Sequence, residues 1–277
     1  MAASIPTKTS TRFIDLDGVR IATRSYGVGQ PLVLLNRFRG TMDNWDPHLV
    51  TSLARERQVI TFDSSGIGES AGKAPLSIET MASVAAGVVR TLALDSPAVL
   101  GWSIGGFVAQ VLALNEPNLV NKLVLAATTT PSGPADVIWN PDWLERASNP
   151  RPTVEVAMSL FYTDTPSSRA AGAASFARMP SPPGAFVSPD AMAAQKQALA
   201  RYVNDPSDWY ARLKEIKAPT FVANGDRDGL FPAVGSALLA REIPGSQLAI
   251  YPDSGHGFLF QHAERFSEDV LRFLKDS

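Results

Sequence analysis

The sequence of 277 residues contains no cysteine and only three histidines. The absence of cysteine excludes disulfides, a thiolate nucleophile and a zinc site with cysteine ligands. Three histidines are too few for a metal site built on a histidine cluster, so we expect no metal. The search for an imidazole that could act as a general base is therefore restricted to His48, His256 and His262.

The chain also lacks an excess of either charge, because 25 basic and 27 acidic residues give a formal net charge of -2. This balance provides no basic surface for nucleic acid. No stretch approaches the roughly 18 apolar residues of a membrane span, and the first residues contain no apolar segment typical of a secretory signal. We expect a cytoplasmic protein that acts on a small molecule, without a nucleic-acid or membrane partner. The sequence gives no indication of its oligomeric state.

Short apolar runs recur in a regular order over the first half of the chain. Two of them flank Asp17-Gly18, a pair that is typical of a β-hairpin, and predict strands at 13–16 and 19–25. After the hairpin, strand candidates alternate with amphipathic or apolar helix candidates, which predicts parallel strands covered by helices on both faces. The predicted strands are 31–35, 58–62, 96–100 and 121–127, and the predicted helices are 46–57, 77–94 and 107–114.

This alternation stops after residue 130. Residues 131–217 contain no strand candidate and are rich in proline, alanine and aromatic residues, which predicts a helical insertion with two or three aromatic side chains facing a pocket. The pattern then resumes. We predict an α/β fold with a mostly parallel, doubly wound sheet of about eight strands. Residues 1–130 and 218–277 form its core, and residues 131–217 form a helical cap inserted between strands 6 and 7. Within the cap we predict helices at 158–162 and 192–202, and after it strands at 219–225 and 247–252 with helices at 233–241 and 264–275.

A glycine-bracketed serine joins the strand predicted at 96–100 to the helix that follows it. Gly101 and Gly105 stand two residues before and two residues after Ser103, which is the G-x-S-x-G pattern of a nucleophile elbow. In that motif a tight turn presents the serine hydroxyl at the carboxyl end of the sheet, and the helix N-terminus points at it. A glycine-rich loop that only packs a helix onto a strand has the same pattern, so the five residues alone leave both interpretations open.

Two later strands end in residues that could activate this serine. Asp226 and Asp228 follow the strand predicted at 219–225, and His256 follows the last predicted strand. A serine hydroxyl needs a base, usually histidine, whose tautomer a carboxylate fixes. Because the carboxyl ends of parallel strands meet at one edge of a sheet, we expect Ser103, an aspartate and His256 to converge there. The other two histidines lie in or beside predicted helices and are expected at the surface.

The loop after the third predicted strand reads N-R-F-R-G-T-M-D-N-W-D-P and should lie next to Ser103. Arg37 and Arg39 in this loop have two interpretations. They could bind an anionic substrate, or they could form solvated pairs with Asp43 and Asp46, which is the commoner arrangement.

Together these motifs resemble the α/β-hydrolase superfamily, and the resemblance covers almost the whole chain. It is carried by the elbow at 101–105, by a D-x-x-G-x-G-x-S turn at 63–70, by a G-x-x-D segment at 225–228 and by the pair Gly255-His256. The turn at 63–70 lacks the residues of a dinucleotide or phosphate-binding loop, so we interpret it as structural.

The resemblance implies a catalytic triad. In the superfamily the acid follows the glycine at its strand end by three residues, which selects Asp228 over Asp226. The implied triad is Ser103, Asp228 and His256, with no cofactor.

The resemblance also implies an oxyanion hole made by the backbone N–H groups of Ile104 and Phe38. The pair Asn36-Arg37 stands where the superfamily usually has His-Gly, and this difference adds a charge near the site. Trp102, the variable residue of the elbow, is a candidate pocket wall, with core packing as its alternative. Arg37 and its neighbour Arg39 are the other candidates for substrate binding.

The resemblance predicts a serine hydrolase that cleaves a small carboxylic ester or lactone through an acyl-enzyme. A serine in place of an aspartate nucleophile argues against an epoxide hydrolase or a dehalogenase. Two other enzymes share the same triad: a haloperoxidase-like perhydrolase that needs no cofactor, and a carbon-carbon bond hydrolase of anionic ring-cleavage products. A non-enzymatic alternative is a small-molecule receptor that keeps the fold and the pocket.

Overall fold

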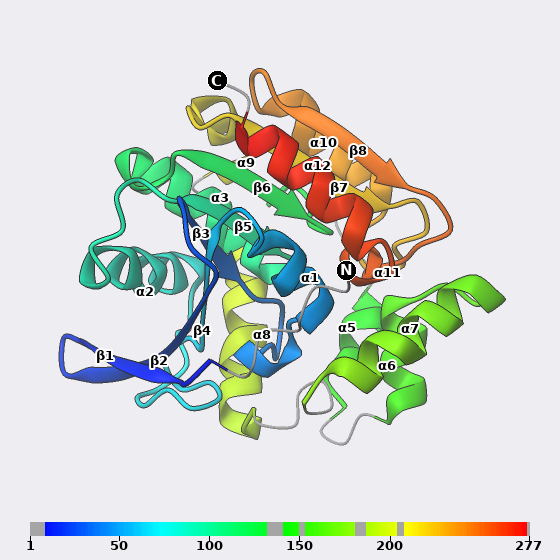
Figure 1. The fold of residues 1–277 in the computed structure, drawn as a ribbon, viewed down its shortest axis with the longest axis horizontal. Coiled ribbons are helices and arrows are strands. Elements are labelled where there is room, and N and C mark those ends of the chain that lie inside the picture. The colour runs from blue at the N-terminus through cyan, green and yellow to red at the C-terminus, as the bar shows by residue number, and fades with distance from the viewer. Residues whose placement is uncertain (1–8, 132–140, 150–152, 181–186, 204–207, 276–277) are drawn as a thin grey trace.

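The computed structural model describes residues 9–131, 141–149, 153–180, 187–203 and 208–275. Its centre is one sheet of eight strands in the order β1-β2-β4-β3-β5-β6-β7-β8 (Figure 1). The hairpin strands β1 and β2 are antiparallel, β2 pairs antiparallel with β4, and all remaining pairs are parallel. The predicted α/β class and strand count are thus confirmed. The strands are β1 (Arg12–Leu16), β2 (Val19–Tyr26), β3 (Pro31–Leu35), β4 (Gln58–Phe62), β5 (Ala98–Trp102), β6 (Lys122–Ala126), β7 (Thr220–Gly225) and β8 (Gln247–Tyr251).

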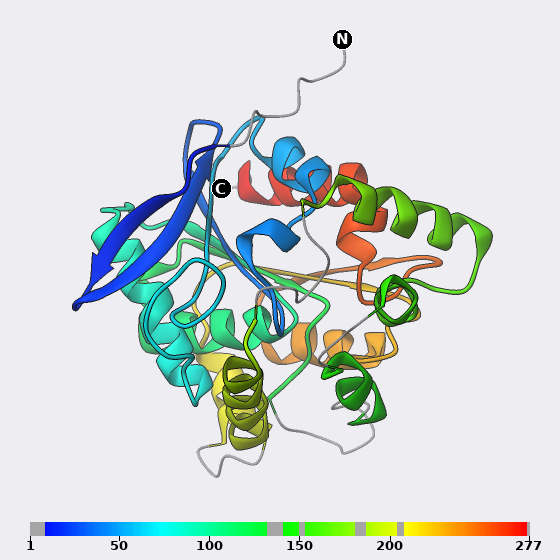
Figure 2. The same ribbon diagram turned by 90° about the horizontal axis from the view of Figure 1, so that it is seen from below.

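Helices cover both faces of this sheet (Figure 2). On one face α1 (Pro47–Leu53) packs against α12 (Ala263–Lys275), and on the other lie α2 (Ile78–Thr91), α3 (Ile104–Asn115) and α10 (Ala233–Glu242). The central strands are buried on both sides, which explains why their sequences are continuous apolar runs. Among the described residues, no helix combines the length and the apolar character needed to cross a membrane.

Element boundaries differ from the prediction on both sides of Ser103. The strand expected at 96–100 continues to Trp102, and the helix expected at 107–114 already begins at Ile104. Only Ser103 therefore separates strand from helix, a tighter turn than the apolar pattern indicated. The first helix is shorter than expected. Asp46 caps its start, because its Oδ1 accepts the N–H of His48 at 2.8 Å, and the helix ends at Leu53 instead of residue 57.

The described parts of the chain between β6 and β7 are helical, as predicted, and contain no strand. The division of the chain into a core and a cap at residues 131 and 217 remains a prediction. The helices of this segment, called the cap helices below, are α5 (Pro141–Ala147), α6 (Val154–Phe161), α7 (Pro166–Arg178), α8 (Pro189–Val203) and α9 (Trp209–Arg212). A short helix after β8, α11 (Phe258–Gln261), was not predicted, and it packs against α7.

Candidate active site

The turn at residues 101–105, called the Ser103 turn below, has a strained backbone. Ser103 has φ 60° and ψ -121°, a conformation that costs a non-glycine residue about 1–3 kcal/mol. The Ser103 N–H donates to the Ala126 carbonyl of the neighbouring strand at 3.0 Å, which holds the turn in place. Strain at a buried serine that lines a pocket is typical of a functional site rather than of a packing loop.

Close approach of backbone atoms explains the two glycines of the Ser103 turn. A Cβ on Gly101 would lie 2.2 Å from the Gly105 carbonyl oxygen. A Cβ on Gly105 would lie 2.1 Å from the carbonyl oxygen of Leu35, at the end of β3. Both distances are far below van der Waals contact, so neither position can hold a side chain without moving backbone. The spacing of the glycines therefore follows from the geometry of the turn.

Asp228 and His256 form a buried pair. The Asp228 Oδ2 lies 2.8 Å from the His256 Nδ1, and Oδ1 accepts the N–H groups of Leu230 at 2.9 Å and Phe231 at 3.1 Å. An ionised carboxylate only accepts hydrogen bonds, so beside such a group Nδ1 of a neutral imidazole carries the proton and Nε2 keeps its lone pair. Asp226 has a different role: its Oδ1 accepts the Ser254 N–H at 3.1 Å and holds the turn before the histidine.

The loop that carries His256 is fixed from two sides. From the core, the Trp102 Nε1 donates to the His256 carbonyl at 3.1 Å. From the cap helices, the Phe161 carbonyl accepts the Gly257 N–H at 2.7 Å, and the Phe161 ring stacks on the imidazole with 6.0 Å between centroids. No motif marks Phe161 in the sequence, because its contacts depend on how the cap helices are placed.

Trp102 does not line the pocket that Ser103 faces. It is 1% exposed and packs against Trp45 and Phe260, with ring centroids at 5.8 Å and 4.8 Å. Core packing, the alternative weighed for this residue, describes its position. Trp102 therefore lies behind the imidazole and supports it.

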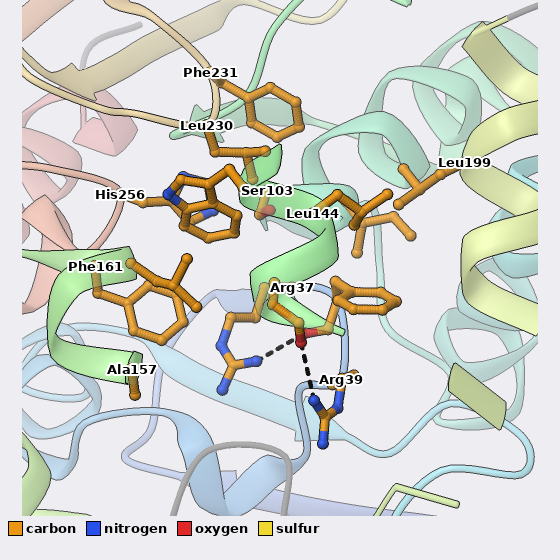
Figure 3. A pocket seen from close by; sticks show the side chains of 15 residues that line it. Arg37, Arg39, Ser103, Leu144, Ala157, Phe161, Leu199, Leu230, Phe231 and His256 are labelled. Atoms are coloured by element: carbon orange, nitrogen blue, oxygen red, sulfur yellow. Dashed lines mark hydrogen bonds between the residues drawn. The ribbon is translucent and has the colours of Figure 1, made fainter. Parts of the chain in front are cut away.

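Ser103 and His256 face one pocket between the sheet and the cap helices (Figure 3). Its walls are largely apolar and come from core loops and from α5, α6 and α8. Two aromatic side chains of the cap helices, Trp143 and Phe161, line the pocket. The sequence predicted that two or three aromatic side chains of this segment would face a pocket, without identifying them. The remaining lining residues are Arg37, Phe38, Arg39, Ile104, Leu144, Ala147, Ala157, Leu160, Leu199, Leu230 and Phe231.

The backbone N–H groups of Ile104 and Phe38 belong to residues on the pocket wall. Within the described ranges neither N–H donates to an acceptor of the chain. Ile104 also begins α3, so its N–H lies at the positive end of a helix. Two unused donors of this kind can stabilise negative charge that develops on a bound carbonyl oxygen.

Comparison with known proteins agrees with this architecture. The model of the alpha/beta hydrolase fold family matches residues 30–263. The chain belongs to the α/β-hydrolase fold family. An alpha/beta hydrolase fold protein from Chitinophaga pinensis superposes with a TM-score of 0.88 at 30% identity, covering 98% of each chain. A non-heme haloperoxidase from Rhodococcus erythropolis is 29% identical over 94% of this chain and 97% of its own. A poly(3-hydroxyalkanoate) depolymerase from Ectopseudomonas oleovorans is 29% identical, covering 88% and 84%.

In this α/β-hydrolase, residues 36–40, called the Arg37 loop below, lie beside the Ser103 turn. The Asn36 side chain shapes the loop, because Oδ1 accepts the Arg37 N–H at 2.8 Å and Nδ2 donates to the Thr41 carbonyl at 2.7 Å. The Gly40 N–H closes the turn on the Arg37 carbonyl at 3.0 Å. A side-chain amide thus organises the loop of this α/β-hydrolase at the position of the expected histidine.

The interpretation of the loop arginines as solvated pairs is wrong. Arg37 and Arg39 are 7% and 4% exposed, so neither is solvated. Within the described ranges, neither forms an ion pair with Asp43 or Asp46, which pair at 2.5 Å with Arg24 and Arg178, respectively. The pairing could not be predicted because the partner arginines are distant in the sequence.

Arg39 connects the Arg37 loop to the cap helices. Its Nη1 donates to the carbonyls of Ala147 at 2.9 Å and Asn149 at 2.7 Å, at the end of α5. Its backbone N–H donates to Oε1 of Gln195, in α8, at 2.9 Å. Arg39 also lines the pocket, and its part in substrate binding stays a prediction.

The other two histidines lie away from the pocket. His48 is exposed, and the His262 Nε2 lies 3.0 Å from the Pro252 carbonyl while its ring packs on Tyr251. In the part of the chain that the structure describes, no three His, Asp or Glu side chains gather in a way that could hold a metal ion.

Proposed function

We propose that this α/β-hydrolase is a serine hydrolase that cleaves a small carboxylic ester or lactone through an acyl-enzyme. One observation carries the proposal: the strained Ser103 and the His256 imidazole, held by Asp228, line the same apolar pocket. The pocket has largely apolar walls with few polar groups, which suits a compound with one reactive acyl group.

The mechanism begins with the Ser103 hydroxyl, which attacks the substrate carbonyl while the His256 Nε2 takes its proton. Asp228 keeps the proton on Nδ1 and stabilises the imidazolium that forms. The Ile104 and Phe38 N–H groups donate to the oxyanion of the tetrahedral intermediate. His256 then protonates the leaving alcohol, and the reverse sequence with water releases the carboxylic acid and restores the serine.

Labelling with a fluorophosphonate probe tests the nucleophile. We expect the wild-type protein to be labelled and Ser103→Ala to lose the label completely, because Ser103 carries the only hydroxyl among the described residues that line the pocket with His256. Ser83→Ala, which removes an exposed hydroxyl on α2, is the matched control and should label like wild type. An unlabelled wild-type protein, or label that persists in Ser103→Ala, contradicts the proposal and favours a receptor.

A second experiment compares the two aspartates in the hydrolysis of p-nitrophenyl acetate. Asp228→Asn should lower kcat by about 10⁴-fold, because an amide no longer selects the Nδ1-protonated tautomer. Asp226→Asn keeps an oxygen that can accept the Ser254 N–H and should lower kcat by less than about tenfold. The assignment fails if Asp226→Asn has the larger effect.

A perhydrolase is the second candidate, since one relative of similar length is a non-heme haloperoxidase. In this reaction hydrogen peroxide replaces water and attacks the acyl-enzyme, so the product is a peracid. Peracid formation from acetate and hydrogen peroxide, lost in Ser103→Ala, would identify it. A carbon-carbon bond hydrolase with the same triad would instead cleave a vinylogous diketone in a hydrolysis panel and leave simple esters intact.

A further inference from the structure

Arg37 brings a buried positive charge into the pocket without a carboxylate partner. Its guanidinium Cζ lies 5.0 Å from the ring centroid of Phe161 and 5.4 Å from that of Trp102. Nη1 donates to the Phe38 carbonyl at 2.6 Å. Among the described residues, no acceptor takes a hydrogen bond from Nε or Nη2, and no acidic side chain forms an ion pair with Arg37.

This arrangement is unfavourable without a bound anion. Burial and, to a smaller extent, the nearby positive charge of Arg39 together lower the pKa of Arg37 to about 9. The guanidinium remains a cation at neutral pH, so the folded protein holds a desolvated charge that nothing in the described chain neutralises. The two aromatic faces compensate only part of the lost hydration. An anion bound beside Arg37 would supply the missing partner.

The shape of the unused donors favours a carboxylate. Nε and Nη2 form one edge of the planar guanidinium, and the two oxygens of a carboxylate match this edge in a bidentate hydrogen bond. Figure 3 shows Arg37 beside Phe161, on the wall of the cavity that Ser103 and His256 also face. No described residue that lines the cavity is acidic, so nothing there repels an anion.

We propose that Arg37 binds a free carboxylate of the substrate. The substrates are then esters or lactones that also carry a carboxylate group, such as half-esters of dicarboxylic acids. This inference rests on the proposed hydrolase function, because the scissile acyl group must lie at Ser103 while the carboxylate lies at Arg37. The apolar remainder of the pocket then surrounds the carbon chain between the two groups.

Binding is measured first, in Ser103→Ala protein, so that no turnover is needed. Monomethyl succinate and methyl butanoate are similar in size and differ in one carboxylate. By titration calorimetry we expect the first to bind at least tenfold more tightly than the second. Arg37→Met in the same background should abolish this preference, Arg37→Lys should keep part of it, and Arg55→Met, which removes an exposed arginine, should keep all of it.

Equal binding of the two esters with Arg37 intact, or a preference that survives Arg37→Met, would overturn the inference. Binding of inorganic phosphate as tight as that of monomethyl succinate would also overturn the inference, because it would indicate a site for any anion. Circular dichroism of Arg37→Met and Arg37→Lys checks that both variants fold. If only one of the two variants folds, its preference for monomethyl succinate over methyl butanoate, compared with that of the protein with Arg37 intact, decides whether Arg37 binds the carboxylate.

Kinetics then separates this inference from the proposed function. In protein with Ser103 intact, Arg37→Met should lower kcat/KM for monomethyl succinate at least tenfold more than for methyl butanoate, mainly through KM. An equal loss for both esters means that Arg37 only shapes its loop, and contradicts the inference. If neither ester is hydrolysed by wild type, the hydrolase proposal fails for these esters, and the binding result still decides whether Arg37 holds a carboxylate.

Discussion

The Ser103 turn and the Arg37 loop follow adjacent parallel strands and meet beside the pocket, yet they are stabilised in different ways. The Ser103 turn depends on backbone: Gly105 packs so closely on β3 that a Cβ there would reach the Leu35 carbonyl. The Arg37 loop depends on side chains, because Asn36 organises its turn and Arg39 ties it to the cap helices.

Under the proposed function, this difference separates the turn that presents the nucleophile from the loop that recognises the substrate. A backbone-determined turn has one workable sequence pattern, since close approach allows only glycine. A loop held by side chains can be built from many residues, and here it uses an amide and two buried cations. Three sets of substitutions test this difference between a backbone-supported turn and a side-chain-supported loop.

Gly105→Ala should disrupt the protein most. The new Cβ would lie 2.1 Å from the Leu35 carbonyl oxygen, so two backbone segments must separate. We expect a loss of more than about 3 kcal/mol in the free energy of unfolding and at least a hundredfold loss of esterase activity. In Gly40→Ala the Cβ meets the Asn36 side chain, 2.2 Å from Oδ1, which can rotate away. Urea unfolding should therefore show a smaller loss, about 1 kcal/mol; equal losses would contradict the distinction.

Asp63, beside the Arg37 loop, makes the free energy of unfolding depend on pH. It follows β4, and its Oδ1 accepts the Met42 N–H at 2.7 Å, just beyond the Arg37 loop. Burial raises the pKa of Asp63 to about 6. Between pH 4 and pH 6 the folded state keeps the proton that the unfolded state releases, so this group makes the free energy of unfolding fall as pH rises.

The measurement compares wild type with Asp63→Asn by urea unfolding at several pH values. The free energy of unfolding of wild type, relative to the variant, should decrease by about 2 kcal/mol from pH 4 to pH 7. Comparing differences removes the contributions of other titrating groups. A difference that does not change with pH would show that the pKa of Asp63 is ordinary.

A double-mutant cycle gives the smallest effect. Asn36→Ala removes the group that a Cβ on Gly40 would meet, so Gly40→Ala should cost almost nothing in that background. We expect a coupling energy of about 1 kcal/mol between the two changes, measured by urea unfolding. Purely additive losses would mean that the Asn36 side chain does not limit residue 40.

Much of the fold could be predicted because its signals are local. The Asp17-Gly18 hairpin and the apolar runs of the central strands each depend on neighbouring residues, and both were found. Boundaries were less accurate where tertiary contacts set them, as at the Ser103 turn. The apolar pattern could not show that strand and helix meet at a single residue, since this depends on how closely β3 and β5 approach.

The sequence by itself determined the strand order along the chain and the positions of Ser103, two aspartates and His256 at strand ends, because backbone periodicity and glycine spacing act over a few residues. The resemblance already pointed to Asp228 as the acid, and the folded chain brings its carboxylate to the imidazole. Only the tertiary structure shows that Trp102 supports the imidazole from behind and that Arg37 is buried with no acidic partner among the described residues. These properties depend on groups that are far apart in the chain, and a side chain's partners exist only once the chain has folded around it.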